Sequence, residues 1–424
     1  MFFKTRKLAG IFAALCLFFH TQSPAQTSSS ESDLSALYDL VYQIVVIETE
    51  TKNKSALGSG FQISADGLVI TNYHVISNFV FEPEHHAIEY VQYDGEKGEL
   101  SLIYFDVIND LAVLQRDEPP VEHLPLATDI PSLGESIYAL GNPRDVGMLM
   151  VSGAYNGLAD YSYTDQILFS GSLNPGMSGG PTVNKYGQVV GVNVATAGSQ
   201  LSFLVPVSKV YDLLEHAAEP LAAEGYTKHI SSQVNQFQDA YFSQLLALDW
   251  ELETLGESVR VPGEMGLDTN CWGSTNEDDE DRNIEILRLV CNNSNSIYLQ
   301  PRLNTGVLHY SYEFNSAIDL SPYRFHKLIS GGGYYPDNSA SNDDVTQFEC
   351  TQKYLETDEL GNSFAQTGFC SRAYVDIEGM YDILFYKTVS EDTRSLTSHF
   401  TLAGVSDEIA LAFTQRFMEE VQWK

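Results

Sequence analysis

The sequence contains the stretch Asn174-Pro175-Gly176-Met177-Ser178-Gly179-Gly180-Pro181, in which one serine stands among glycines and prolines. Glycine permits a tight backbone turn, and a serine in such a turn can present its hydroxyl as a nucleophile. The amides of Gly176 and Ser178, with that of Met177 as a third candidate, could stabilise a negatively charged oxygen beside it. A Gly/Ser segment can also be an ordinary turn. The interpretation therefore depends on whether a base and an acid occur elsewhere.

A histidine and an aspartate do occur upstream of Ser178. The histidine lies in Thr71-Asn72-Tyr73-His74-Val75-Ile76, directly after an apolar run that predicts a strand. The aspartate lies in Asp106-Val107-Ile108-Asn109-Asp110-Leu111-Ala112-Val113-Leu114, where Asp106 and Asp110 compete for the role. We favour Asp110, because it directly precedes the apolar run. A carboxylate at that buried edge needs a partner such as an imidazole.

These segments, in the order His74, Asp110, Ser178, resemble the trypsin-fold serine peptidases of the bacterial HtrA/DegP type. The order differs from that of subtilisins and of α/β-hydrolases. Other segments that carry the resemblance are Gly58-Ser59-Gly60-Phe61, Ala65-Asp66-Gly67-Leu68-Val69-Ile70-Thr71, Gly141-Asn142-Pro143, Gly191-Val192-Asn193 and Phe203-Leu204-Val205-Pro206. The resemblance covers residues 37–217 and says nothing about the remainder.

The resemblance implies peptide-bond hydrolysis through an acyl-enzyme, with no metal or other cofactor. His74 would take the proton of Ser178 as general base, while Asp110 holds the tautomer of the imidazole. The amides of Gly176, Met177 and Ser178 would form the oxyanion hole. The segment Asn193, Val194 and Ala195 would bind a protein or peptide substrate.

Met177 departs from the pattern of the family, because HtrA-type peptidases usually carry Asn there and pancreatic-type peptidases carry Asp. Activation by a freed N-terminal amine, which pairs with that Asp, is therefore not open to this chain. Methionine also lacks the polar contacts that could hold the loop. We expect activity to be either constitutive or set by ordering of the loop.

Short apolar runs separated by turn residues predict a mainly β fold for this half of the chain. The expected strands are Val41 to Ile47, Gly60 to Ile63, Leu68 to Asn72, Ile88 to Tyr93, Leu100 to Val107, Ile137 to Leu140 and Gln188 to Val194. The absence of helical crossovers between them favours antiparallel barrels over a parallel α/β sheet. With the resemblance, this predicts two six-stranded antiparallel β-barrels of the trypsin type.

The first residues have the pattern of a secretory signal. Lys4, Arg6 and Lys7 precede an apolar run from Leu8 to Phe19, and Ser23-Pro24-Ala25 offers small residues for cleavage. The apolar run is shorter than the ~20 residues that a bilayer requires. We predict a signal peptide over residues 1–25, removed together with Cys16, and a flexible leader over residues 26–36. The mature protein would be exported, to the periplasm or the extracellular space, with no membrane span.

The chain has 424 residues and a formal net charge of −34. This length predicts two or three domains of about 150 residues. Such a negative chain is poorly suited to bind nucleic acid or anionic lipid.

Four cysteines follow the signal: Cys271, Cys291, Cys350 and Cys370. An even number in an exported chain predicts disulfides, although four cysteines allow three pairings. The second pair repeats the spacing of the first, and similar runs follow each: Leu308 to Phe314 against Ile383 to Val389, and Tyr323-Arg324-Phe325 against Ser398-His399-Phe400. We infer an internal duplication in a disulfide-containing α+β domain, with repeats near residues 258–335 and 336–424.

The predicted domain order is a peptidase domain (37–217), a helical linker (218–257) and a C-terminal domain (258–424). Val207 to Ala218 would be the helix that closes the peptidase domain. Apolar residues spaced by three and four between Lys228 and Leu255, the last at Leu248 and Leu252, predict an amphipathic helix. Ser406-Asp407-Glu408 would cap a final helix ending near Trp423. No carboxylate-binding loop like that of PDZ domains, which HtrA proteins normally carry here, is recognisable.

Two acidic or histidine-bearing segments are weak metal candidates. His85-His86 lies near Glu82 and Glu84, and Glu277 to Asp281 is acidic but lacks the spacing of a calcium loop. We interpret both as solvated surface.

The sequence therefore predicts an exported serine endopeptidase whose C-terminal module binds substrate or a protein partner. The alternative is a non-catalytic or partner-activated binding protein that keeps the peptidase fold as a scaffold.

Overall fold

The computed structural model describes residues 34–142, 147–160, 162–198, 200–266, 268–293, 296–329, 336, 338, 340–356 and 363–423. The predicted signal peptide, Pro143 of the Gly-Asn-Pro segment and most of the predicted leader lie outside these residues. The last three residues of the predicted leader, 34–36, belong to a 3₁₀-helix, η1 (Leu34–Leu40). No helix in the described part of the chain is long and apolar enough to cross a membrane.

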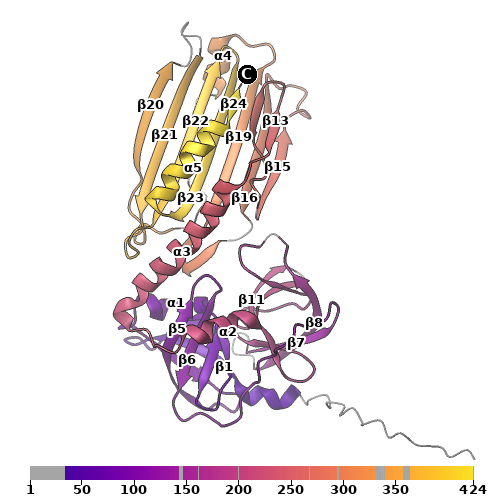
Figure 1. Ribbon diagram of the computed structural model, residues 1–424, viewed down its shortest axis with the longest axis vertical. Helices are drawn as coiled ribbons and strands as arrows, with labels where there is room; N and C mark the ends of the chain where they lie inside the picture. The colour runs from indigo at the N-terminus through magenta and orange to yellow at the C-terminus, as the bar shows by residue number, and fades with distance from the viewer. Residues whose placement is uncertain are drawn as a thin grey trace, which may run out of the picture. The chain divides into compact units, whose positions relative to one another are not determined.

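Two closed six-stranded antiparallel barrels form the first half of the described chain (Figure 1), as the sequence predicted. The first has the order β1-β2-β3-β6-β5-β4 and the second β10-β11-β12-β9-β8-β7. The first barrel comprises β1 (Val41–Glu48), β2 (Lys54–Gln62), β3 (Leu68–Thr71), β4 (His86–Val91), β5 (Lys97–Asp106) and β6 (Leu111–Arg116). The second comprises β7 (Ser136–Gly141), β8 (Leu149–Leu158), β9 (Ile167–Phe169), β10 (Pro181–Val183), β11 (Val189–Gly198) and β12 (Leu201–Pro206).

Alternating apolar residues explain how the strands form barrels. In β4 the buried residues are Ile88 and Tyr90, and in β5 Leu100 and Leu102 are buried while Glu99 and Ser101 are exposed. Successive side chains of a strand point to opposite faces, so this alternation puts one face inside the barrel. A further cluster that includes Phe61, Leu111 and Val192 joins the two barrels.

One helix lies between strands of the first barrel, and further helices follow the second barrel. The helix α1 (Tyr73–Phe81) lies within the first barrel's sequence, and α2 (Val207–His216) closes the second where predicted. After η3 (Ala223–Gly225) comes α3 (Tyr226–Ala247). The predicted helix over 228–255 was too long: Leu248 follows the helix, and Leu252 begins the strand β13 (Leu252–Leu255). This strand pairs with β14 (Val259–Pro262), so hydrogen bonds between strands replace those of a helix.

The C-terminal half is built on a seven-stranded antiparallel sheet with the order β15-β16-β19-β23-β22-β21-β20. Its strands are β15 (Thr269–Thr275), β16 (Ile284–Asn293), β19 (Leu308–Ala317), β20 (Glu349–Glu356), β21 (Ser363–Ala373), β22 (Tyr381–Glu391) and β23 (Arg394–Val405). The hairpin β17 (Ile297–Gln300)–β18 (Leu303–Thr305) forms a separate sheet. The helix α4 (Pro322–Ile329) follows β19.

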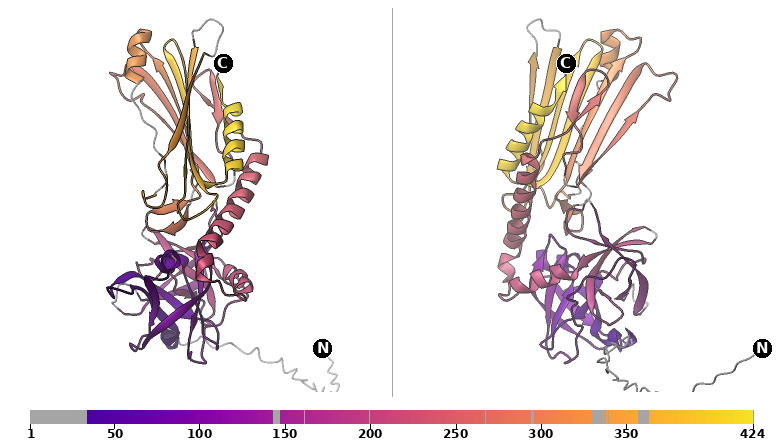
Figure 2. Two further views of the ribbon diagram at one scale, coloured as in Figure 1. Left: turned by 90° about the vertical axis from the view of Figure 1, so that its left-hand side faces the viewer. Right: turned by 45° about the vertical axis from the view of Figure 1, so that its right-hand side comes forward.

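One face of this sheet is covered by α3 and by α5 (Asp407–Glu420), which lie along the same side (Figures 1 and 2). Phe242 of α3 and Phe413 and Phe417 of α5 are buried against Tyr310 and Phe400 of the sheet. Ser406 caps α5 as predicted, accepting a hydrogen bond from the amide of Ile409. The helix ends at Glu420 rather than near Trp423, because Gln422–Trp423 forms β24, which pairs with β14.

The two disulfides are Cys271–Cys291 and Cys350–Cys370. Each joins directly opposite residues of a hairpin, β15–β16 in one case and β20–β21 in the other. The two hairpins occupy opposite edges of the sheet. Within the sheet, β19 lies beside the first hairpin and β22 beside the second. The duplication of these segments stays a prediction. The second pair of matched runs does not share a structure, because Tyr323-Arg324-Phe325 is helical and Ser398-His399-Phe400 belongs to a strand.

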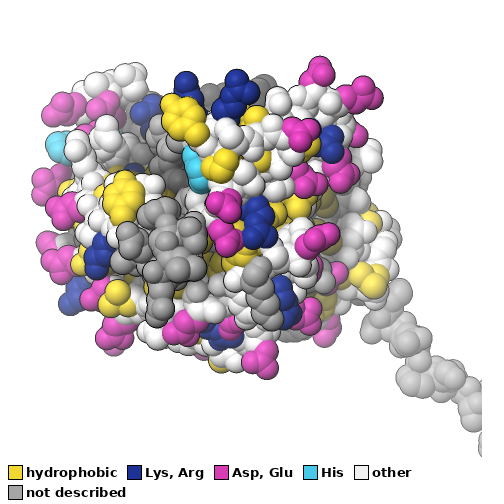
Figure 3. Space-filling view, turned by 90° about the horizontal axis from the view of Figure 1, so that it is seen from above, with side chains coloured by type: hydrophobic (Ala, Val, Ile, Leu, Met, Phe, Trp, Pro, Cys, Tyr) yellow, Lys and Arg dark blue, Asp and Glu magenta, His cyan; other side chains and the backbone are white. Residues whose placement is uncertain are grey.

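Many of the acidic side chains that give the chain its net charge of −34 lie on the surface (Figure 3). On the face drawn in Figure 3, Asp and Glu side chains are spread widely among the described residues, with Lys and Arg between them.

Candidate active site

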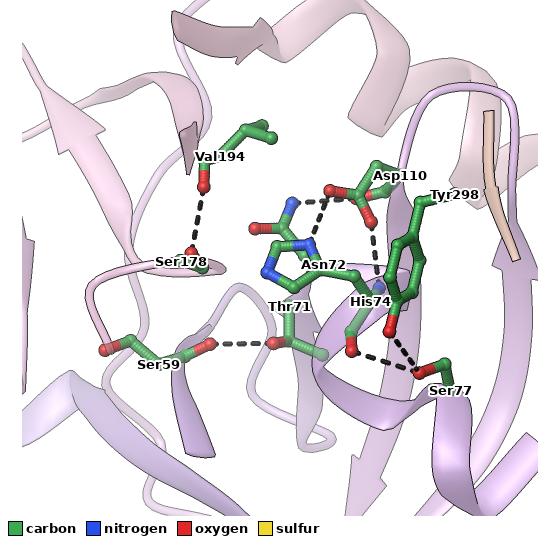
Figure 4. Close-up of polar contacts among 9 residues, drawn as sticks. All are labelled: Ser59, Thr71, Asn72, His74, Ser77, Asp110, Ser178, Val194 and Tyr298. Carbon is green, nitrogen blue, oxygen red and sulfur yellow. Dashed lines mark hydrogen bonds and ion pairs between the residues drawn. The ribbon is translucent and has the colours of Figure 1, made fainter. Parts of the chain in front are cut away.

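The three residues predicted as a triad come from both barrels and lie together in Figure 4. His74 stands in the first turn of α1, and Asp110 immediately precedes β6. Ser178 lies in the segment between β9 and β10 of the second barrel.

Asp110 holds His74 through two hydrogen bonds. Its Oδ2 lies 2.7 Å from Nδ1 of the imidazole, and its Oδ1 accepts from the backbone amide of His74 at 2.8 Å. The ring nitrogen Nδ1 is therefore held toward the carboxylate, and Nε2 faces Ser178 (Figure 4). This is the orientation that a general base requires.

The local backbone explains why Asp110 can do this. Asp110 has a φ of +53°, a left-handed conformation that Asp tolerates better than most residues. Asn72 is the N-cap of α1, but its side chain donates to the carbonyl oxygen of Asp110 at 2.7 Å instead of capping the helix. Asp110 therefore takes the capping role, and its negative charge is favourable at a helix N-terminus.

Two opposing effects act on the protonation of the imidazole. Burial disfavours the charged form and by itself lowers the pKa of His74. The negative charge of Asp110 and its hydrogen bond act in the opposite direction and prevail, so the pKa of His74 is raised above its ordinary value. The protonated form of the His74 imidazole is thereby stabilised.

Asp106, the competing acid, is engaged elsewhere. Its carboxylate accepts hydrogen bonds from the amides of Ile108 and Asn109 and from the Asn109 side chain. It therefore shapes the turn that precedes Asp110.

The hydroxyl of Ser178 donates a 2.9 Å hydrogen bond to the carbonyl oxygen of Val194. Val194 lies at a register shift in the pairing of β11 with β12, where Asn193 pairs with Leu204 and Ala195 with Phe203. Such a bulge redirects a backbone group out of the ladder. The carbonyl of Val194 is thus available to Ser178.

The backbone around Ser178 turns sharply at two glycines. Gly176 and Gly179 have φ values of +96° and +83°, which favour glycine. Within the described residues, the amides of Gly176 and Ser178 have no intramolecular acceptor. The amide of Met177 instead donates to the carbonyl of Asn174 at 3.0 Å and closes a turn. The geometry thus offers two donors, from Gly176 and Ser178.

The loop is held by polar contacts from neighbouring strands. Ser59 donates from its hydroxyl to the carbonyl of Gly176 at 2.7 Å, and its amide donates to the carbonyl of Ser178 at 2.7 Å. The side-chain amide of Asn193 donates to the carbonyl of Met177 at 3.2 Å. The Met177 side chain is fully buried in the core of the second barrel. Apolar packing and these hydrogen bonds together hold the loop that carries the unusual methionine.

The three predicted substrate-binding residues occupy different positions. Asn193 is fully buried and hydrogen-bonded to Thr182 and to the carbonyls of Leu140 and Met177. Val194 contacts Ser178 through its carbonyl. Ala195 pairs with Phe203 in the ladder of β11 and β12. On the edge of β11 that faces away from β12, the strand pairing with β10 extends only to Val192 of β11.

Sequence reasoning missed two contributors to the site. Ser59 was seen only as part of a Gly-Ser-Gly-Phe segment, whose spacing gives no sign of a contact with Gly176. Tyr298 comes from β17, far along the chain, and its ring stands edge-on to that of His74 with ring centres 6.1 Å apart (Figure 4). No local pattern could have indicated this contact.

The metal candidates form no ligand set among the residues that the structure describes. His86 instead approaches Glu82 through Nδ1, 3.2 Å from its carbonyl oxygen and 3.7 Å from its carboxylate.

Comparison with known proteins agrees with this geometry. Residues 58–192 match a family described as "Trypsin-like peptidase domain". This part of the chain is therefore a trypsin-like peptidase domain, and its similarity is to serine proteases of the HtrA/DegP type.

Among the relatives, Serine protease HTRA4 of Homo sapiens is 34% identical over 169 residues, covering 37% of this chain and 34% of that protein. A probable periplasmic serine endoprotease, DegP-like, of Rhizobium meliloti is 31% identical over 171 residues, covering 38% of this chain and 33% of that protein. The chain thus spans about a third of the length of the curated relatives it matches. The crystal structure of the serine endoprotease from Yersinia pestis is 25% identical, with a TM-score of 0.38, over 43% of this chain and 64% of that one.

Proposed function

We propose that this protein is a serine endopeptidase that hydrolyses peptide bonds in proteins through His74, Asp110 and Ser178. The observation that carries the proposal is the pair of hydrogen bonds that Asp110 accepts from His74, with Nε2 of the imidazole directed toward a serine beside two available backbone amides. The family of residues 58–192 supports the same reaction class.

The first chemical step forms an acyl-enzyme. Ser178 Oγ attacks the scissile carbonyl carbon while His74 Nε2 takes the hydroxyl proton. The amides of Gly176 and Ser178 stabilise the oxyanion, a contribution of about 3 kcal/mol for one such donor. When the carbon–nitrogen bond breaks, the proton on His74 passes to the leaving amine. Water, deprotonated by His74, then hydrolyses the acyl-enzyme and restores the Ser178 hydroxyl.

Substrate binding also prepares the nucleophile in this proposal. The pairing of β11 with β10 ends at Val192, and the backbone of Asn193 bonds to Gly179 and Gly180, so a peptide can add as an extended strand along β11 from Val194 onward. An amide of that peptide would compete for the carbonyl of Val194, which accepts from Ser178 in this structure. Rotation about the Cα–Cβ bond would then direct the released hydroxyl toward His74.

The wider role follows from the same interpretation. We propose that the protein is exported and that the module formed by residues 258–424 binds substrate or a protein partner. A DegP-like relative is described as periplasmic, which supports export. The competing function, a scaffold without catalysis or one activated by a partner, is favoured by the hydrogen bond that holds Ser178 away from His74.

A fluorescent fluorophosphonate tests the activated nucleophile. We expect the protein to be labelled, Ser178→Ala to lose labelling completely, and Ser172→Ala, an exposed serine of the same segment, to retain it. Absence of labelling in all three proteins would contradict a constitutive peptidase. Labelling that appears only after addition of extracellular extract would establish the partner-activated form.

A further inference from the structure

The hairpin β17–β18 of the C-terminal half packs against the helix that carries the catalytic histidine. Tyr73 in α1 donates a hydrogen bond to the carbonyl oxygen of Leu299 at 2.7 Å. Ile297, Leu299 and Leu303 are buried in one hydrophobic cluster with Val75, Ile76 and Val80 of α1. The helix that presents His74 is therefore part of a core to which both halves of the described chain contribute.

Tyr298 brings this hairpin to His74 itself. Its ring is nearly perpendicular to the imidazole, at an interplanar angle of 78°. Its hydroxyl lies 3.3 Å from Oγ of Ser77, and Ser77 in turn donates to the backbone carbonyl of His74 at 3.2 Å. Tyr298 thus contacts both the ring and, through Ser77, the backbone of the histidine (Figure 4).

We propose that Tyr298 is a positioning residue for His74, supplied by the C-terminal module, so that this module completes the catalytic site of the peptidase domain. This inference rests on the proposed peptidase function.

Two physical effects follow from the contact. The ring blocks rotation of the imidazole away from Asp110, and an aromatic pair of this geometry adds attraction beyond the buried area. Burial, together with the charge of Asp110, raises the pKa of the Tyr298 hydroxyl, which therefore stays protonated and can serve as a donor to Ser77. His74 is thereby kept in one orientation before the substrate arrives.

Because Tyr298 acts through His74, its loss should affect turnover more than substrate affinity. In full-length Tyr298→Leu we expect kcat on a peptide substrate to fall about 10- to 100-fold, since small displacements of a catalytic group have effects of this size. KM should change less than about threefold, because Tyr298 is not expected to contact the substrate. Tyr298→Phe, which keeps the aromatic ring, should retain most of the activity of the parent protein. Tyr323→Leu, at a residue 78% exposed in the same module, is the matched control.

A second readout does not need activity. In the Ser178→Ala background, proton NMR of the His74 Nδ1 hydrogen reports the hydrogen bond to Asp110. We expect a slowly exchanging low-field signal that broadens or disappears in Tyr298→Leu and persists in Tyr298→Phe. If Tyr298→Leu does not fold, Tyr298→Met takes its place, since it fills the site without a ring.

The outcomes separate the two proposals. Unchanged kcat and an unchanged Nδ1 signal in Tyr298→Leu would overturn the positioning role, even with an active parent protein. An inactive parent whose Nδ1 signal depends on Tyr298 would contradict the peptidase function and support the contact. An equal loss of kcat in Tyr298→Leu and Tyr323→Leu would show a general structural effect and also overturn the proposal.

Discussion

At the scale of single residues, Asp110 holds both the backbone and the ring of His74. Its Oδ1 accepts from the amide of His74, and its Oδ2 accepts from the imidazole. The carboxylate therefore fixes the start of α1 and the orientation of the catalytic ring together. A change at Asp110 should alter both the rate of the reaction and its dependence on pH.

We predict that Asp110→Asn lowers kcat by about 10⁴-fold, the loss known for this triad position in another trypsin-fold enzyme, because the ring then adopts the wrong tautomer. In the unaltered protein, activity should rise as pH increases through the pKa of His74, which lies above the ordinary 6.5, since only neutral imidazole accepts the serine proton. Asp110→Asn removes the charge that raises this pKa, so the acidic limb of the kcat/KM profile should move to lower pH. A limb that stays in place would count against this account.

At the scale of elements, the two disulfide hairpins close loops of equal length at the two edges of the C-terminal sheet. Each disulfide spans a sequence separation of 20 residues. Edge strands pair on one side only, so a covalent link to the neighbouring strand restrains the part of the sheet that is least supported.

We predict that replacing both Cys350 and Cys370 with serine lowers the free energy of unfolding by about 3 kcal/mol, because the unfolded chain regains the entropy of an open loop. Urea denaturation, followed by circular dichroism, measures this change. The corresponding double replacement of Cys271 and Cys291 is the matched comparison and should have a similar or larger effect, since Cys291 is fully buried. An unchanged midpoint for the Cys350/Cys370 variant would contradict the prediction.

At the scale of the whole molecule, the buried cluster that contains Leu299 crosses between the peptidase domain and the C-terminal module. The same cluster includes Tyr226 and Ile230 of α3, the helix that connects the two. A shared core means that neither part can lose its structure without exposing apolar surface of the other.

We therefore predict one cooperative thermal transition for both parts. Trp272 and Trp423 belong to the C-terminal module, and Trp250 is buried in the hydrophobic cluster of its sheet, so the fluorescence of these three tryptophans reports that module. Labelling of Ser178 reports the peptidase domain. Leu299→Ala, which removes a fully buried side chain, should cost about 2–5 kcal/mol and lower both midpoints together. Two separate midpoints, or a shift of the tryptophan signal alone, would show that the parts unfold independently.

Local patterns were sufficient to predict the barrels, and they indicated His74, Asp110 and Ser178 as the candidates that lie together in the structure (Figure 4). Alternating burial in β4 and β5 follows directly from the spacing of apolar side chains, and the motifs around His74, Asp110 and Ser178 occur in a trypsin-like order. The length of α3 was harder to predict. The apolar spacing continues to Leu252, but the helix ends at Ala247, and Leu252 begins a strand that pairs with β14. Apolar spacing indicates an amphipathic pattern, but it does not reveal that residues 252–255 pair with β14, which in turn pairs with β24 near the end of the described chain.

Long-range contacts decided the rest. The pairing of four cysteines, the hydrogen bond from Ser59 to Gly176 and the contact of Tyr298 with His74 all join residues whose neighbours in sequence carry no sign of them. Each depends on how strands and helices pack in three dimensions. The amino-acid pattern thus determined the barrels and the choice of the candidate triad residues, because these depend on local periodicity and side-chain chemistry. Tertiary packing alone decided how those groups are held, because that depends on surfaces far apart in the chain.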